Sequence, residues 1–178
     1  MKLLREILYK VEINSVVGNT SLSINKIEFD SRLISDGDMY IAITGVNVDG
    51  HSFISQAIKN GANCIVCEKI PDNKTDGVVY VNVKSSRKAL AIISSNYFDN
   101  PSSKLNLIGV TGTNGKTTIA TLLFDLYTEL EIKSGLISTV KISYDNKNIQ
   151  ANQTTPDSLS INRFLNEMVN SNVRYCFM

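Results

Sequence analysis

The chain has 178 residues, and its 18 Lys and Arg residues nearly balance its 17 Asp and Glu residues; this near-neutral charge argues against a nucleic-acid partner bound by a basic surface. Hydrophobic residues make up 43% of the chain, which is typical of a globular protein with one or two domains. Because no apolar run reaches the roughly 20 residues of a membrane-spanning helix, and charged residues follow Met1 too early for a signal peptide, we expect a cytoplasmic protein without membrane insertion.

The first hundred residues alternate strand-like and helix-like patterns, which predicts a small α/β domain. A helix near residues 52–60 should end at Gly61, and a second helix near 86–98 should have Ser85 as its N-cap. The residues that the helical spacing places on the apolar faces are Phe53, Ile54, Ala57, Ile58, Leu90, Ile93 and Tyr97, and we expect the first four to be buried. The segments expected to form strands are 24–29, 39–43, 63–67 and 78–83.

Two polar loops follow predicted strands in this part of the chain. The first is Phe29-Asp30-Ser31-Arg32, and the second runs from Gly45 to His51. Small polar groups and free backbone at strand ends could hold a ligand. The alternative, which the residues alone favour, is turn chemistry: Asx turns, helix caps and a surface pair of Asp30 and Arg32. His51, a lone histidine close to Asp49, is interpreted as structural rather than catalytic.

The three cysteines do not form a convincing metal or redox motif. Cys64 and Cys67 have C-x-x-C spacing, but a zinc site would need a second ligand pair. A thioredoxin-type motif belongs at the start of a helix, whereas these two residues lie in a predicted strand. We therefore expect Cys64, Cys67 and Cys176 to be buried free thiols.

A polar stretch with a proline, residues 99–103, separates these elements from a second set. We expect a buried strand over 105–111, a helix over 117–131 and a strand over 135–140, and such a crossover implies a parallel sheet. The elements expected after it are a hairpin over 141–150, a helix from about Leu159 to Val169 and a strand over 173–178. The fold class is therefore α/β, with a small amino-terminal domain followed by the start of a parallel-sheet domain.

The segment Thr111-Gly112-Thr113-Asn114-Gly115-Lys116-Thr117-Thr118 has the chemistry of a phosphate-binding loop. Its glycines would let backbone N–H groups approach a polyphosphate. Lys116 would contact the β- and γ-phosphates of ATP, and Thr117 would offer its hydroxyl to Mg²⁺. The loop departs from the pattern G-x-x-x-x-G-K-[ST], because Val110 stands where the first glycine belongs. The alternative is an ordinary strand-to-helix turn, and the flanking strand and helix argue against it.

A second polar segment, Gln153-Thr154-Thr155-Pro156-Asp157, lies beyond the next predicted strand of the same sheet. Ligands of open α/β sheets bind beyond the carboxyl ends of the strands. The two adjacent threonines could hold a phosphate or an amide there. Alternatively, Thr155-Pro156-Asp157 only opens the following helix.

These segments together resemble the Mur ligases, the cytoplasmic ATP-dependent enzymes that build the peptidoglycan stem peptide. The phosphate loop resembles theirs, which departs from the general pattern at the same glycine, although folylpolyglutamate and cyanophycin synthetases look similar there. The segments that resemble the MurE branch are Phe29-Asp30-Ser31-Arg32, Gly37-Asp38-Met39-Tyr40-Ile41-Ala42, Asp49-Gly50-His51-Ser52-Phe53, Ala57-Ile58-Lys59-Asn60-Gly61-Ala62 and Thr154-Thr155-Pro156-Asp157.

The resemblance implies a P-loop ATPase domain and a role for each segment. Residues 1–100 would bind the UDP-muramoyl substrate, and 104–178 would begin the central ATP-binding domain. The residues implied in ATP binding are Gly112, Thr113, Asn114, Gly115, Lys116, Thr117 and Thr118, with Lys116 catalytic and Thr117 the metal ligand. Those implied in binding UDP-N-acetylmuramoyl-L-alanyl-D-glutamate are Phe29, Ser31, Val46, Asn47, Val48, Gln153, Thr154 and Thr155.

The resemblance further implies an ATP- and Mg²⁺-dependent ligase that adds meso-diaminopimelate or L-lysine to this dipeptide through an acyl phosphate. We expect a monomer, and an amino-terminal fragment that is inactive alone, because the family's carbamylated lysine, second metal ligand and amino-acid-binding domain are not in these residues. The alternatives are a ligase of the MurF branch, or a non-catalytic module that binds a UDP-sugar or nucleotide.

Overall fold

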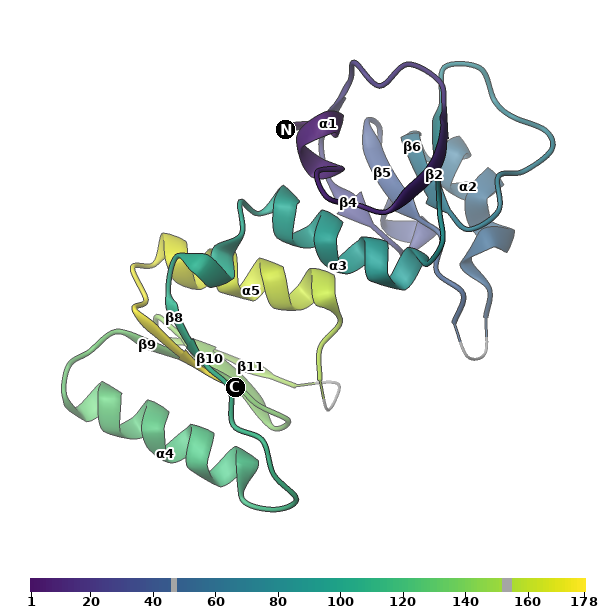
Figure 1. Cartoon of the computed structure of the whole chain (residues 1–178). Helices are drawn as coiled ribbons and strands as arrows, with labels where there is room; N and C mark the ends of the chain where they lie inside the picture. The colour runs from purple at the N-terminus through teal and green to yellow at the C-terminus, as the bar shows by residue number, and fades with distance from the viewer. Residues whose placement is uncertain (46–47, 152–154) are drawn as a thin grey trace. The chain divides into compact units, whose positions relative to one another are not determined.

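The computed structural model describes residues 1–45, 48–151 and 155–178, and its internal contacts divide the chain into two compact units (Figure 1). The first unit is Met1–Tyr97 and the second is Phe98–Met178. None of the helices in the described ranges combines the length and the hydrophobicity that a membrane span requires.

The first unit contains a five-stranded sheet in the order β2-β7-β6-β5-β4. The four strands β4 to β7 are parallel, and β2 pairs antiparallel with β7 at one edge. The bounds of these strands are Ile13–Val17 for β2, Ile27–Glu28 for β4, Asp38–Ile41 for β5, Ala62–Cys67 for β6 and Val79–Val83 for β7. All four residues of β5 are buried, so both faces of the sheet centre are covered, as is typical of parallel sheets.

One helix of the first unit packs on this sheet, and a longer helix follows β7. Helix α2 (Ile54–Lys59) follows the 3-10 turn η2 (Gly50–Phe53), and its Ile54 and Ala57 join the apolar cluster around Tyr40. Helix α3 (Ser86–Tyr97) begins where expected, with the Lys88 N–H donating to Ser85 Oγ at 3.4 Å, and it contacts the short helix α1 (Leu4–Ile7).

Several expectations for the first unit were wrong in detail. Phe53 is 40% exposed, not buried, because it lies in the 3-10 turn and not in the helix. The segment 24–29 forms two short strands, because β3 (Ser23–Ile24) pairs with β1 (Lys2–Leu3) while β4 joins the main sheet. The strands β1 and β2 and the short helix α1 (Leu4–Ile7) were not predicted.

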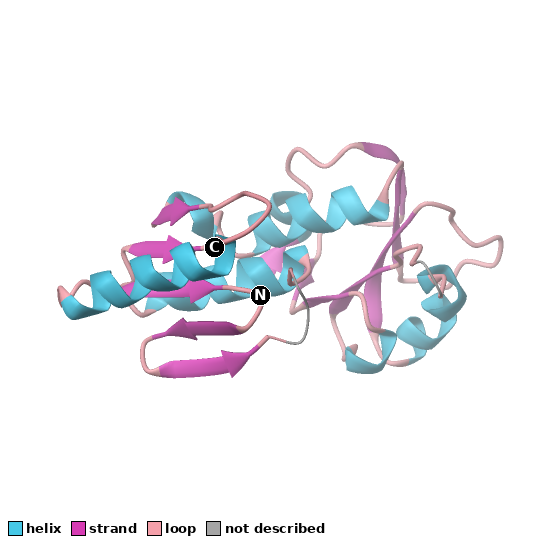
Figure 2. Ribbon diagram, turned by 90° about the horizontal axis from the view of Figure 1, so that it is seen from below, coloured by secondary structure: helices cyan, strands magenta, loops and turns pink. Residues whose placement is uncertain are grey.

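The second unit contains another five-stranded sheet, in the order β11-β10-β9-β12-β8 (Figure 1, Figure 2). The strands β8, β12 and β9 are parallel and β10 and β11 form a hairpin, as predicted. The hairpin continues the sheet, because β10 pairs antiparallel with β9. The bounds are Asn106–Ile108 for β8, Ser134–Ile137 for β9, Lys141–Tyr144 for β10, Lys147–Gln150 for β11 and Tyr175–Phe177 for β12. A 3-10 turn, η3 (Pro101–Ser103), precedes β8.

Two helices cover opposite faces of this sheet. Helix α4 (Lys116–Glu129) packs on Leu136 and Phe177, and α5 (Ser158–Asn170) packs on Ile137 and Cys176. Neighbouring residues of a strand point to opposite faces, which places Leu136 under α4 and Ile137 under α5.

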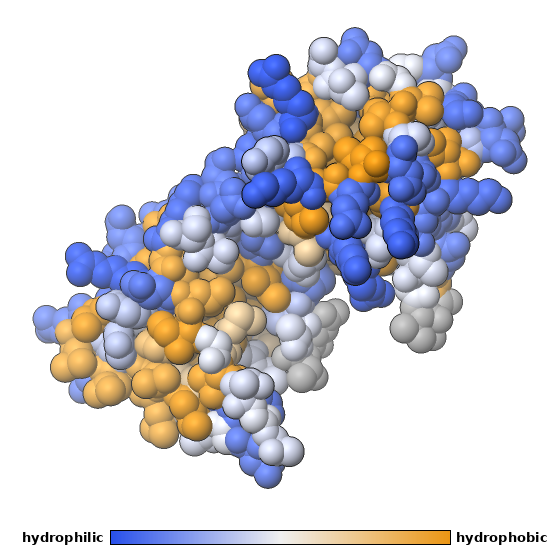
Figure 3. Space-filling view, in the orientation of Figure 1, coloured by the Kyte–Doolittle hydropathy of each residue, from blue (hydrophilic) through white to orange (hydrophobic). Residues whose placement is uncertain are grey.

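The strand predicted over 105–111 is present as β8, but the expectation that it is buried was wrong. Asn106 and Leu107 of β8 are exposed, because β8 lies at the edge of the sheet and pairs with β12 alone among the described strands. The outward face of α4 is also apolar, and Figure 3 shows hydrophobic residues on the surface in this part of the chain. Its exposed residues are Ile119, Leu122, Leu126 and Leu130.

Candidate functional site

The predicted phosphate loop joins β8 to α4, and its backbone is shaped by two glycines. Gly112 has φ +154° and Gly115, the N-cap of α4, has φ +80°. The latter angle lies in the left-handed region that side chains other than glycine avoid. Within the described residues, no side chain caps the start of α4. The N–H groups of its first turn are therefore available to an anion, on the side of the positive end of the helix dipole.

Lys116 lies at the first position of α4 and reaches back over this loop. Its Nζ donates to the carbonyl oxygen of Gly112 at 2.5 Å and to that of Thr113 at 3.1 Å. The ammonium is thus held beside the loop backbone, where it can neutralise the charge of a phosphate that the loop amides bind.

A cavity of about 490 Å³ lies beside the loop, at the carboxyl ends of the parallel strands. It brings together the loop, the first turns of α4, the end of β9 and Thr155. Its lining residues are Gly109, Val110, Thr111, Lys116, Thr117, Ala120, Ile137, Ser138, Thr139, Thr155, Pro156 and Met178. Thr155 thus lines the same cavity as Lys116 and Thr117, although 38 or more positions separate them in the sequence. Gln153 and Thr154 lie outside the described residues.

The donor groups beside the loop are compatible with Mg²⁺ held mainly by a nucleotide. Thr117 Oγ1 lies 3.1 Å from Thr139 Oγ1, and both residues line the cavity. Mg²⁺ prefers oxygen ligands and is commonly bound by few protein groups together with substrate phosphates and water. In the described ranges, no group of three or more His, Cys, Asp or Glu side chains could hold a metal alone. A hydroxyl ligand from Thr117 fits this donor set.

The alternative interpretation of the second polar segment was that it only opens the following helix, which is α5. Asp157 is the N-cap of α5, and its Oδ1 accepts the N–H of Ser160 at 2.9 Å. The helix-opening interpretation is therefore confirmed for Asp157. This capping does not involve Thr155, whose side chain remains available to the cavity.

In the first unit, two of the predicted loops lie at one edge of the sheet. They follow β4 and β5, which are parallel neighbours, so their carboxyl ends meet at that edge. Phe29 is 36% exposed, Ser31 is buried in the 3-10 turn η1 (Ser31–Leu33), and Val48 is 58% exposed. The carbonyl of Ser31 accepts a hydrogen bond from Asn60 Nδ2 at 2.8 Å. Val46 and Asn47 lie outside the described residues.

Turn chemistry is present in both loops, as the alternative predicted. Asp30 Oδ1 accepts the N–H of Arg32 at 3.0 Å, and the Arg32 guanidinium pairs with the Asp30 carboxylate at 2.7 Å. The side-chain hydrogen bond from Arg32 lowers the pKa of Asp30. These local bonds fix the backbone of the first loop without involving Phe29 or the Ser31 hydroxyl.

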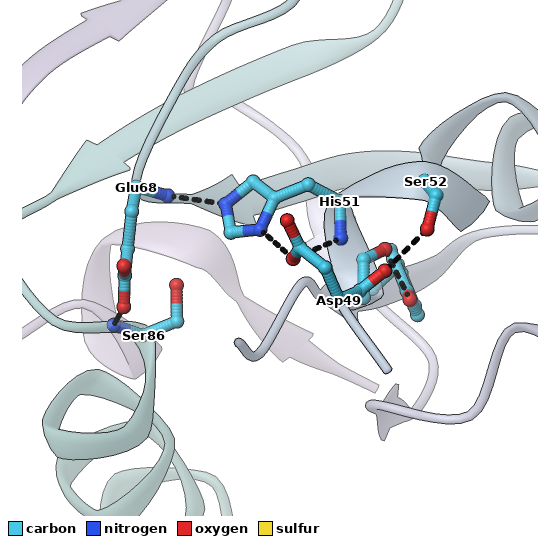
Figure 4. A network of polar contacts seen from close by, with 7 residues as sticks. Asp49, His51, Ser52, Glu68 and Ser86 are labelled. Carbon is cyan, nitrogen blue, oxygen red and sulfur yellow. Dashed lines mark hydrogen bonds and ion pairs between the residues drawn. The ribbon is translucent and has the colours of Figure 1, made fainter. Parts of the chain in front are cut away.

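His51 connects the second loop to Glu68, the residue directly after β6 (Figure 4). Its Nε2 accepts the backbone N–H of Glu68 at 2.9 Å, so the neutral ring carries its proton on Nδ1 and donates it to Asp49 Oδ1 at 2.7 Å. Asp49 Oδ1 also accepts the His51 N–H at 3.0 Å, and this backbone bond is the main cause that lowers the pKa of Asp49. Ser52 Oγ donates to the Asp49 carbonyl. The structural interpretation of His51 is confirmed.

Three residues of these networks were not predicted. Glu68 Oε1 accepts the N–H of Ser86 at 2.9 Å and so caps α3. The Tyr40 hydroxyl donates to the Gly50 carbonyl at 2.9 Å, and burial raises the pKa of Tyr40 to about 12. Thr139 contacts Thr117. Of these three residues, only Tyr40 could have been identified from the sequence, because it lies in a predicted strand shortly before the second loop.

The cysteines are free and buried, as predicted. Burial raises the pKa of Cys67 to about 11 and of Cys176 to about 12, and it raises that of Cys64 as well. Thiols in this state are poor nucleophiles and poor metal ligands.

Family models match both units of the chain. Residues 23–98 match the Mur ligase family, catalytic domain, and residues 110–178 match the Mur ligase middle domain. The chain belongs to the Mur ligase family. It is 47% identical over 176 residues to a UDP-N-acetylmuramoyl-L-alanyl-D-glutamate--2,6-diaminopimelate ligase of Cytophaga hutchinsonii, and 44% identical over 177 residues to the enzyme of the same name from Clostridium tetani. Each match covers 98% of this chain and 36% of the relative, so the chain spans about a third of the length of these curated relatives.

Solved structures show the same fold. A structure of a UDP-N-acetylmuramoyl-L-alanyl-D-glutamate--2,6-diaminopimelate ligase matches 99% of this chain and 35% of its own, with a TM-score of 0.76 and 21% identity. The MurF ligase of Thermotoga maritima, solved in complex with ADP, matches 77% of this chain and 28% of its own, with a TM-score of 0.53 and 29% identity. The predicted α/β fold class is confirmed.

Proposed function

We propose that the protein containing this chain is an ATP-dependent ligase of peptidoglycan precursor synthesis. It joins an amino acid to UDP-N-acetylmuramoyl-L-alanyl-D-glutamate, and the names of the relatives support 2,6-diaminopimelate over L-lysine. The single observation that supports this most is the cavity in which Lys116 and Thr117 lie together with Thr155. It supports the proposal because the loop proposed to bind phosphate lines the same cavity as Thr155 of the segment proposed to contact the muramoyl peptide.

The two units have different roles in this proposal. Residues 1–100 bind the UDP-muramoyl substrate, with Phe29, Ser31 and the loop Val46-Asn47-Val48 on the uridine side. Residues 104–178 begin the ATP-binding domain. There, ATP contacts residues 112–118, while Gln153, Thr154 and Thr155 contact the muramoyl-peptide side. The protein acts as a monomer in the cytoplasm, where ATP and the UDP-linked substrate are available.

The reaction transfers the γ-phosphoryl group of ATP to the side-chain carboxylate of D-glutamate, giving an acyl phosphate and ADP. The amine of the incoming amino acid then attacks the acyl carbon, and phosphate leaves. Phosphoryl transfer depends on positioning and on neutralising charge. The loop amides and Lys116 position the phosphates of ATP and neutralise part of their charge. Mg²⁺ bound to ATP, with Thr117 as one ligand, would neutralise further phosphate charge.

An assay of phosphate release from the full-length protein tests the proposal. Release should require ATP, UDP-muramoyl-dipeptide and 2,6-diaminopimelate together, with L-lysine as the comparison. Release that is independent of the muramoyl substrate would overturn the proposal. A requirement for UDP-muramoyl-tripeptide and D-alanyl-D-alanine instead would assign the protein to the MurF branch, and nucleotide binding without any turnover would support a binding module.

A further inference from the structure

Thr139 reaches the phosphate-loop helix from a different strand. Its Oγ1 lies 3.1 Å from Oγ1 of Thr117, 22 positions earlier in the chain. Thr139 follows the carboxyl end of β9, and Thr117 is the second residue of α4. Both line the cavity beside the phosphate loop. The contact therefore joins two elements that meet only in the folded sheet.

The turn after β9 is held by Ser138 and leaves the Thr139 side chain for this contact. Ser138 Oγ donates to the Lys141 carbonyl at 2.8 Å and accepts the N–H groups of Val140 at 3.3 Å and Lys141 at 3.1 Å. The Ser138 N–H also donates to the Lys141 carbonyl at 3.0 Å. These bonds fix the backbone on both sides of Thr139, so its hydroxyl is presented from a rigid turn.

The Thr117 hydroxyl differs from a usual helix threonine. A threonine in a helix commonly donates to the carbonyl four residues earlier, as Thr128 does to Phe124 at 2.8 Å. The contact of the Thr117 hydroxyl is instead with Thr139. A hydroxyl that gives a lone pair to a cation must direct its hydrogen elsewhere, and Thr139 Oγ1 is an acceptor at hydrogen-bond distance.

We propose that Thr139 is a positioning residue, which accepts the hydrogen of the Thr117 hydroxyl and so orients the Thr117 lone pair toward the Mg²⁺ of a bound nucleotide. This inference rests on the proposed function, because it requires that the loop bind a magnesium nucleotide. Thr139 itself acts through Thr117.

Calorimetric titration of the full-length protein with ADP, in Mg²⁺ and in EDTA, tests this role. Thr139→Val removes the hydroxyl and keeps the shape of the side chain, and Thr139→Ser keeps the hydroxyl. Losing one hydrogen bond should reduce the gain in ADP affinity that Mg²⁺ gives by about threefold to tenfold in Thr139→Val. Thr139→Ser should stay within about twofold of wild type. Affinity in EDTA should not change in either variant.

Thr128→Val is the matched control, because it removes a threonine hydroxyl from the other end of α4 and should leave both affinities unchanged. An equal loss in Mg²⁺ and in EDTA for Thr139→Val would indicate a merely structural role and overturn the inference, as would no loss at all. If Thr139→Val fails to fold, Thr139→Ala is judged by the same criteria. A wild-type protein that does not bind ADP would overturn the proposed function as well, whereas normal binding with an unaffected Thr139→Val would overturn this inference alone.

Discussion

The ammonium of Lys116 donates a hydrogen bond to the carbonyl oxygen of Gly112 at 2.5 Å, so the cation lies against the backbone of the proposed phosphate loop. Replacing Lys116 by alanine should lower kcat/KM for ATP by about 100-fold or more, because a charge-stabilising donor at the reacting phosphate is lost. The fold should be kept, since Lys116 is exposed. Steady-state phosphate release and circular dichroism of the full-length protein check the two statements.

Lys133→Ala is the control for that experiment. Lys133 Nζ donates to the Ser171 carbonyl at 3.1 Å, and the residue lies just before β9, beyond the carboxyl end of α4. Its removal should leave kcat/KM close to the wild-type value. Near-normal activity of Lys116→Ala would contradict the role given to this lysine.

Two glycines with nearly the same positive φ angle allow the cost of backbone strain to be measured separately from an effect on ATP binding. Gly115 has φ +80° and Gly77 has φ +81°, and an added Cβ would meet nothing closer than 4.0 Å at Gly115 and nothing within 4 Å at Gly77. Alanine at either position should therefore cost about 1 kcal/mol of stability. Only Gly115→Ala should also weaken ATP binding, because its methyl group would stand at the phosphate loop. Thermal unfolding and nucleotide titration measure the two effects, and equal ATP affinity of the two variants would disprove the loop assignment.

Glu167 joins α5 to the β10–β11 hairpin. Its carboxylate accepts the Tyr144 hydroxyl at 2.6 Å and pairs with Lys147 at 2.9 Å. These bonds, the tyrosine first, lower the pKa of Glu167 below its ordinary value of 4.5. A depressed pKa contributes stability above the unfolded-state value, and the contribution disappears as the pH falls through the folded-state value.

Glu167→Gln should therefore lower the melting temperature at pH 7, and the difference from wild type should shrink toward pH 3. The carboxylate is 37% exposed, so screening by water keeps the effect to no more than about 1 kcal/mol. Glu129→Gln, on the exposed side of α4, is the control, and it should leave the melting temperature unchanged at pH 7 and at pH 3. If the difference in melting temperature between wild type and Glu167→Gln grew as the pH fell, the stabilising role of the ionised carboxylate would be refuted.

His51 stabilises the loop after β5 by joining Asp49 to the backbone of Glu68. His51→Ala leaves the Glu68 N–H without this acceptor and should cost about 1 kcal/mol of stability. It should also raise the KM for the UDP-muramoyl substrate, with the KM for ATP unchanged, because the affected loop is in the first unit. Arg32→Ala provides the contrast, since an ion pair with an 85% exposed arginine should have no measurable effect on stability. A change in both KM values would argue against a local role of His51.

Much of the fold was predictable because its signals are local. Apolar runs bounded by glycine and proline placed most strands and helices, and the hairpin over 141–150 was found from its turn residues. The strands β1 and β2 were missed because they are short or exposed, so burial leaves little periodicity in their sequences. Phe53 and Leu107 are apolar yet exposed, and hydrophobicity alone does not distinguish an edge or a turn from a core position.

The amino-acid sequence by itself determined the glycine turn between β8 and α4 that we propose binds phosphate, because the conformation of such a segment depends on residues within a few positions of one another. It also determined the Asx turns at Asp30 and Asp49 for the same reason. Only the tertiary structure decided that Thr139 and Thr155 line the cavity of that loop, and that His51 binds the backbone of Glu68. These partners lie 17 to 38 positions apart, and their proximity depends on strand order and register, which are settled by packing of the whole sheet.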